Sequence, residues 1–126
     1  MSAVKLMHHK ETVGLDRDQL EVLFLQHGPV GADKIVNQAL EDLAVGLSQL
    51  RKAVSADRKD DATREIRTLI TIAQQLGMTK LARIGRDALA LVGHKDVAAC
   101  HAVLARLNRV GEGSLIAVWD LQDMSV

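Results

Sequence analysis

The most regular pattern of apolar and polar positions lies between residues 33 and 54. Apolar residues recur there at alternating spacings of four and three, at Val36, Leu40, Leu43, Leu47, Leu50 and Val54. Such a row lies along one face of an α-helix, because the helix completes a turn every 3.6 residues. The pattern predicts a long amphipathic helix from about Asp33 to Val54. Gly46 costs about 1 kcal/mol relative to alanine inside a helix, which indicates a close helix contact there.

Three further segments repeat this periodicity. Their apolar rows are Ala62, Ile66, Leu69, Ala73 and Leu76; Met78, Leu81, Gly85, Ala88 and Val92; and Val97, Cys100, Leu104 and Leu107. Gly77 and Gly93 follow the first two rows and suit helix ends, since glycine adopts the left-handed conformation without strain. The segment SLIAVWDL (114–121) is compatible with either a strand or a helix. Because Leu115, Val118 and Gln122 continue the last row, we favour a helix that persists or restarts over residues 108–126.

A short helix is predicted before these four. Asp16 is suited to cap its first turn while Gln19 reaches back, and Leu15 and Leu20 occupy the positions of a hydrophobic staple. The run His27-Gly28-Pro29 is expected to end it.

These elements predict an all-α protein, an antiparallel up-down four-helix bundle with a short additional N-terminal helix laid across one end. Residues 1–14 show no repeat and are predicted to form a mobile N-terminal arm. Residues 15–126 are predicted to form a single bundle domain, because two such helices alone would leave a leucine seam exposed to water.

Composition and charge narrow the possible functions. The chain has 126 residues, of which 48% are hydrophobic and 2% aromatic, and its 16 basic and 16 acidic residues give a net charge of zero. A neutral chain with few aromatic rings argues against nucleic-acid binding. No uncharged apolar run approaches the ~18 residues that a membrane span requires. The single cysteine, Cys100, cannot form an internal disulfide, so we expect a cytoplasmic protein.

Candidate chemistry is sparse. The sequence contains no glycine-rich nucleotide loop, GxSxG or HExxH motif. Its histidines are His8, His9, His27, His94 and His101. His8 and His9 lack further metal ligands, His27 lies at a helix end, His94 is expected in a solvated turn, and His101 is expected to be half-buried. Cys100 is expected to be a small buried apolar residue. We therefore predict no enzyme activity, metal or cofactor.

One segment is similar to a known family. Residues 66–82 read IRTLITIAQQLGMTKLA. This segment resembles the signature of histidine-containing phosphotransfer (HPt) domains, which reads A-H-x-L-K-G-x-A-x-x-L-G-x-x-x-L-A. The matching packing positions are Leu69, Ala73, Leu76, Gly77, Leu81 and Ala82. The resemblance covers about seventeen residues as a motif and, as architecture, most of the chain from Asp33 to Met124. It implies an HPt-like bundle and a role in two-component phosphorelay signalling.

The departures from this family fall at its functional positions. Arg67 stands at the position of the phosphoacceptor histidine, Ile70 at that of the lysine, and Thr71 at that of the glycine. A guanidinium group stays protonated and offers no lone pair to a phosphoryl group. The resemblance therefore implies a non-catalytic module that binds a response-regulator receiver domain or a histidine kinase.

Spacing places Arg67, Ile70, Thr71 and Gln74 on one helix face. One interpretation of this face is a protein-contact patch. In the other, Arg67 and Gln74 are ordinary solvated residues, and Ile70 widens the apolar row that this helix turns toward the core. Two other functions stay open. One is phosphotransfer through a non-standard histidine, His94 or His101. The other is a structural module that forms a homodimer through the arm or through the segment LIAVWDL.

Overall fold

The structure of the protein is a computed structural model that describes residues 16–124, with side chains to residue 120. Within this range the chain is helical and contains no strand. The helices are α2 (Arg17–Ser55), α3 (Lys59–Gln75), α4 (Thr79–Leu91) and α5 (Val97–Met124). The all-α prediction is therefore confirmed, and residues 108–124 continue as one helix with the preceding part of α5.

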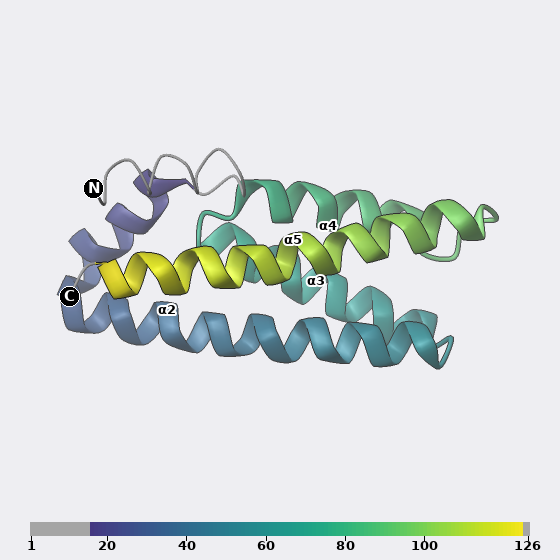
Figure 1. The fold of residues 1–126 in the computed structure, drawn as a ribbon, viewed down its shortest axis with the longest axis horizontal. Helices are drawn as coiled ribbons and strands as arrows, with labels where there is room; N and C mark the ends of the chain where they lie inside the picture. Colours follow the sequence, from purple (N-terminus) through teal and green to yellow (C-terminus); the bar gives the residue numbers. More distant parts are fainter. Residues whose placement is uncertain (1–15, 125–126) are drawn as a thin grey trace.

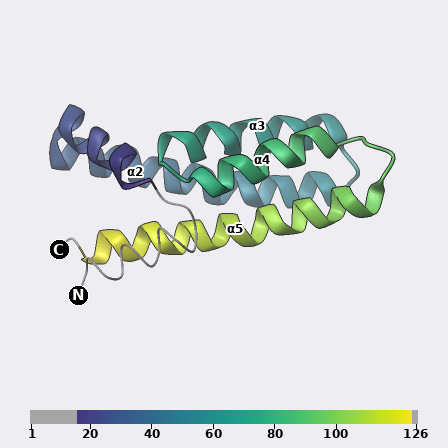
Figure 2. The same ribbon diagram turned by 90° about the horizontal axis from the view of Figure 1, so that it is seen from above.

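The four helices form a bundle. Each contacts the next along the chain, and α5 returns to contact α2. The chain reverses direction at each connection, so that consecutive helices lie alongside one another (Figures 1 and 2). The α2–α3 and α4–α5 connections lie at the same end of the bundle, and the first part of α2 lies at the other end.

A kink divides α2 into two parts. Asp16 caps the first part, because its Oδ1 accepts a hydrogen bond of 3.0 Å from the backbone N–H of Asp18. Gly28 then leaves the helical conformation, with φ 71° and ψ 171°. Helix resumes directly after Gly28 rather than near Asp33, because Pro29 tolerates the first position of a helix, where no N–H is needed. Leu15 of the predicted staple and the predicted arm 1–14 lie outside the described residues.

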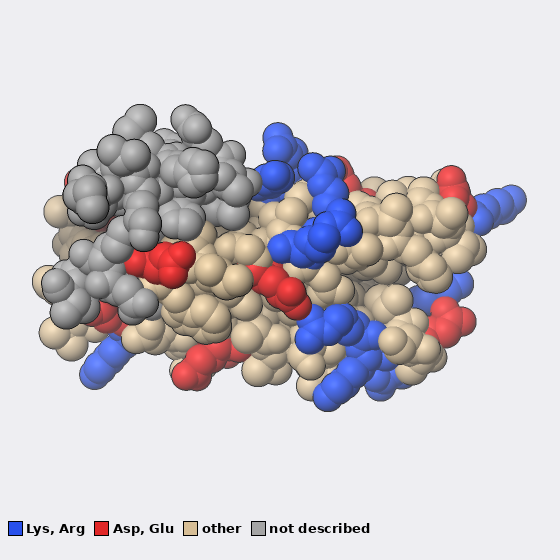
Figure 3. Space-filling view, in the orientation of Figure 1, with Lys and Arg blue, Asp and Glu red and all other residues tan. Residues whose placement is uncertain are grey.

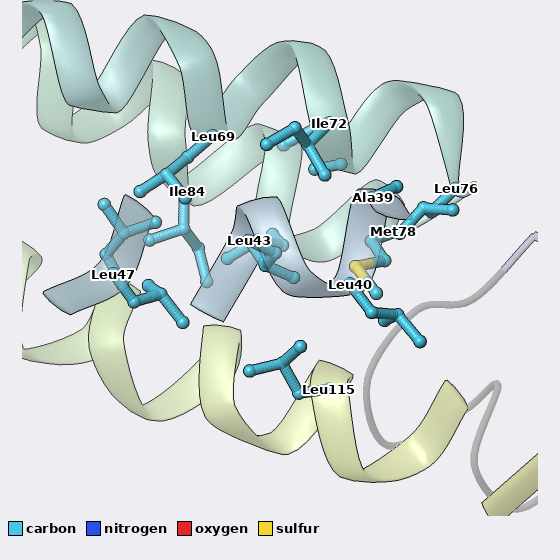
Figure 4. Close-up of a cluster of buried hydrophobic side chains, with 14 of the residues drawn as sticks. Ala39, Leu40, Leu43, Leu47, Leu69, Ile72, Leu76, Met78, Ile84 and Leu115 are labelled. Carbon is cyan, nitrogen blue, oxygen red and sulfur yellow. The ribbon is translucent and has the colours of Figure 1, made fainter. Parts of the chain in front are cut away.

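The predicted apolar rows meet in the core, which extends along the bundle (Figure 4). Its largest fully buried side chains are Leu40, Leu43, Leu47, Leu50, Ile66, Leu69, Leu76, Met78, Leu81, Ile84 and Leu107. Leu115 and Val118 extend the row of α5, as predicted. The other end of this row is different: Val97 is 61% exposed and Cys100 is only half-buried, so the prediction that both point into the core is wrong for Val97.

Glycines permit close approach of the helices at three places. A Cβ at Gly46 would lie 2.9 Å from Leu69 Cδ2, which confirms the close contact that the sequence indicated between α2 and α3. In the same way, Gly85 of α4 receives Ile70, and Gly111 of α5 receives Leu47. A leucine or isoleucine from the neighbouring helix thus occupies the space of each missing methyl group.

The α3–α4 turn anchors the start of α2. The backbone N–H groups of Gly77 and Met78 donate to the carbonyls of Gln74 and Ala73, at 3.3 and 2.8 Å, which is the Schellman pattern. Gly77 has a φ of +71°, as its predicted role in ending the helix requires. The backbone N–H of Asp16 then donates to the Gly77 carbonyl at 2.6 Å. A short turn therefore holds three helices together at this end.

Candidate protein-binding site on α3 and α4

Arg67 lies at the midpoint of α3 and its side chain is exposed. Its backbone carbonyl accepts a hydrogen bond of 3.1 Å from the Thr71 hydroxyl. Among the residues that the structure describes, no ion pair involves the Arg67 guanidinium. Five N–H donors and a full positive charge are thus available to a partner on the outer side of the bundle.

Ile70 lies on the same face of α3, but its side chain packs between α3 and α4. It is half-buried, and its Cγ1 occupies the space beside Gly85, 2.7 Å from where a Cβ on that glycine would lie. This contact favours the interpretation in which Ile70 widens the apolar stripe of α3. The surface that remains for a partner is therefore more polar than the four-residue spacing alone indicates.

Thr71 and Gln74 are exposed on the turns that follow Arg67. Gln74 borders a shallow hollow of about 280 Å³ whose lining includes Gly77, Ala82 and Arg86. Asp16 contributes to the same hollow, because the start of α2 is anchored to the α3–α4 turn. The structure thus brings residues from three helices next to the predicted face, and no spacing in the sequence indicates this hollow.

Basic side chains are concentrated on the hairpin that α3 and α4 form. Residues 66–86 contain four basic residues and no acidic residue, although the whole chain is neutral. The basic residues are Arg67, Lys80, Arg83 and Arg86. The three arginines are exposed, and no ion pair of theirs is found in the described part of the chain. Figure 3 shows Lys and Arg side chains gathered over the region where α4 and α5 lie side by side. The net charge of zero over the whole chain conceals this local excess of positive charge.

The other predicted chemical groups lie elsewhere. His94 is exposed in the α4–α5 connection, and its Nδ1 accepts a hydrogen bond of 3.2 Å from the backbone N–H of Asp96. His101 is exposed, not half-buried as expected, since it lies to the side of the inward row of α5. His27 is exposed beside the kink in α2, and His8 and His9 lie outside the described residues. Among the side chains that the structure describes, those of residues 16–120, no cluster of three or more is arranged to hold a metal ion.

Comparisons with known proteins supply no identification. No protein-family model, no curated protein and no solved structure matches the chain. None of the helices in the described range combines the length and apolar character needed to cross a membrane. The main candidate for a functional surface is the exposed, basic face formed by Arg67, Thr71, Gln74 and Arg86, called the Arg67 face below.

Proposed function

We propose that the protein is a non-catalytic HPt-like module that binds a receiver domain or a histidine kinase through the Arg67 face. The observation that carries this proposal is the position of Arg67, which is exposed at the centre of α3 where the similar family has its phosphoacceptor histidine. In this proposal the bundle is of the antiparallel HPt type, cytoplasmic, and retained for binding after loss of the chemistry.

Burial along the motif supports this alignment. The positions that match the family's packing residues are all buried, and they are Leu69, Ala73, Leu76, Gly77, Leu81 and Ala82. Arg67 and Thr71, which replace the family's histidine and glycine, are exposed. A register error of one residue would turn buried motif positions outward, because successive helix residues are about 100° apart around the axis. The pattern of burial is therefore the one that the proposed alignment requires.

The chemistry of the Arg67 face supports binding without transfer. The Arg67 guanidinium offers donors but no lone pair, so it holds an anionic group without forming a bond to phosphorus. Thr71 places a branched side chain where the family has a glycine, which changes how closely a partner can approach. The unpaired arginines favour a partner with an acidic surface, since complementary charge speeds association and fixes orientation.

A binding assay with matched arginine variants tests the proposal. Purified receiver domains and histidine kinases from the same cell are titrated against the full chain and against Arg67→Ala, by calorimetry or biolayer interferometry. We expect at least one partner to bind, and Arg67→Ala to weaken binding about tenfold, as for an interfacial arginine worth 1–2 kcal/mol. Arg106→Ala is the control, because Arg106 is an exposed arginine of α5.

Two results would contradict the proposal. One is the absence of binding to every receiver and kinase; the other is an equal loss of affinity in Arg67→Ala and Arg106→Ala. The same proteins test phosphotransfer through a non-standard histidine. Acid-labile phosphate that is acquired from a phosphorylated receiver and lost in His94→Ala or His101→Ala would favour transfer over binding alone.

A second candidate function is self-association. Ile116 and Trp119 are 56% and 47% exposed and lie three residues apart, so they share one side of α5. Exposed apolar side chains at this spacing favour a helix-to-helix contact, which was predicted for the segment LIAVWDL. Light scattering of the full chain and of Trp119→Ser decides between a dimer that dissociates in the variant and a monomer in both.

A further inference from the structure

The α2–α3 and α4–α5 connections lie at the same end of the bundle (Figures 1 and 2). Residues of both connections line a second hollow. Its volume is about 480 Å³, within the range of small-molecule sites. Residues of α2, α3 and α5 line it, together with the connection that follows α4. None of its lining residues belongs to the Arg67 face, so binding at this hollow is independent of the proposed function.

The hollow is a part of the core that the chain does not fill. Along the inward row of α5, Leu104 is 6% exposed, Cys100 is half-buried and Val97 is 61% exposed. The lining from α2 and α3 includes Ala53 and Ala62, whose single methyl groups leave the space open. Apolar surface is thus presented to water at the place where the periodicity predicts contact, which is a property of binding sites.

The lining is aliphatic at its base and mainly cationic at its edge. It contains no phenylalanine, tyrosine or tryptophan, so aliphatic side chains supply its apolar surface. The charged and titratable residues of the lining are Asp57, Arg58, Lys59, His94, Cys100 and His101. Asp57 is the one carboxylate among them, so the edge favours an anion.

The hydrogen bonds at this edge indicate which donors a ligand would meet. Arg58 pairs with Asp61 at 3.4 Å and is therefore partly neutralised. Lys59 takes part in no ion pair within the described part of the chain. His94 accepts a backbone hydrogen bond at Nδ1, so in the neutral imidazole the proton is on Nε2, which is a donor. Lys59 and His94 therefore supply an ammonium and an imidazole N–H at the edge of an aliphatic hollow.

We propose that this hollow binds an aliphatic carboxylate. The hydrocarbon chain lies against Val54, Val97 and Leu104, and the carboxylate accepts hydrogen bonds from Lys59 and His94. Binding is non-covalent, and it removes from water the apolar surface of the hollow, such as that of Val97. Positive charge at the edge distinguishes this ligand from a cationic amphiphile with the same hydrocarbon chain.

Titration with octanoate tests the proposal on the full chain, with backbone amide NMR shifts as the readout. We expect saturable binding with a Kd of about 1 mM or lower, with shifts confined to residues around the hollow. Octyltrimethylammonium carries the same chain with the opposite charge and is expected not to bind. Lys59→Gln is expected to weaken octanoate binding about fivefold, since it removes one charge-assisted hydrogen bond.

A filling variant separates the hollow from non-specific binding. Ala62→Leu places an isobutyl group into the space and is expected to weaken octanoate binding more than about tenfold while leaving the melting temperature equal or higher. Ala102→Leu is the control, because Ala102 is exposed on α5 and does not line the hollow. The proposal is overturned if octanoate shows no saturable binding, if the cation binds equally well, or if a folded Ala62→Leu binds like the parent. Should Ala62→Leu unfold, the head-group comparison and Lys59→Gln give the same decision.

Discussion

The two ends of the bundle contain the same turn in different surroundings. After α3, the Schellman turn has Gly77 in the left-handed conformation, buried beneath the start of α2. After α2, the N–H groups of Asp57 and Arg58 donate to the carbonyls of Val54 and Ala53, at 3.1 and 2.9 Å, in the same pattern. Here Asp57 takes the left-handed position, with φ 55°, and is exposed beside the hollow. The local motif requires only that backbone conformation, whereas tertiary packing decides whether glycine is the only residue that fits.

The largest expected difference between the two regions concerns leucines of the core. Leu43 is fully buried in the middle of the bundle, whereas Leu104 borders the hollow. We expect Leu43→Ala to lower the free energy of unfolding by about 4 kcal/mol and Leu104→Ala by about 2 kcal/mol, because the first creates a closed cavity and the second enlarges an open one. Urea denaturation measures both, and equal losses would show that the open end is packed as tightly as the middle.

The turn glycines provide the next comparison. Gly77→Ala is expected to lower the free energy of unfolding by about 3 kcal/mol, because the left-handed conformation disfavours a residue with a Cβ. That Cβ would also lie 2.6 Å from the backbone oxygen of Asp16. Gly93 has a similar φ of +79° but nothing within 4 Å of a Cβ. Gly93→Ala is therefore expected to lower the free energy of unfolding by only about 1 kcal/mol. Thermal melts of the pair measure the difference, and similar melting temperatures would contradict an anchored start of α2.

The smallest effect is expected at Asp57. Asp57→Gly removes the strain of a non-glycine residue in the left-handed conformation and is expected to raise the free energy of unfolding by about 1 kcal/mol. Asp57→Ala is the control, because it removes the carboxylate and keeps the strain. Chemical denaturation of both variants measures the change. Stabilisation by Asp57→Ala as well would assign the effect to charge instead of backbone conformation.

The fold was largely predictable because its signals are local. The row Val36 to Leu50 and the ends at Gly77 and Gly93 need only helical periodicity and backbone preference. The restart of helix at Pro29 was missed, because Gly28 alone absorbs the change of direction that the whole run His27-Gly28-Pro29 was expected to make. A glycine or proline in a helical sequence predicts where the helix axis changes direction, but not how many residues leave the helical conformation.

The candidate sites were less predictable because they depend on what lies opposite. Spacing places Val97 and Ile70 on definite sides of their helices. It does not show that Val97 meets a hollow beside alanines, or that Ile70 meets Gly85 and sinks between two helices. Arg67 was found from the motif, whereas the arginines of α4 join it only through the α3–α4 hairpin. Residue type and helical period predict on which side of its helix a side chain lies. The residues that it contacts there depend on the neighbouring helix.

The kink at Gly28 has a consequence for local opening. Before it, Leu23 is buried and Leu20 half-buried, whereas Val22, Phe24 and Leu25 stay exposed, so little apolar burial holds this part of α2. After it, the leucine row from Leu40 to Leu50 is buried in the core. We therefore expect the two parts of one helix to open as separate cooperative units. In a hydrogen-exchange measurement, amide hydrogens before Gly28 are expected to exchange through sub-global opening, and those of the leucine row only when the whole bundle unfolds.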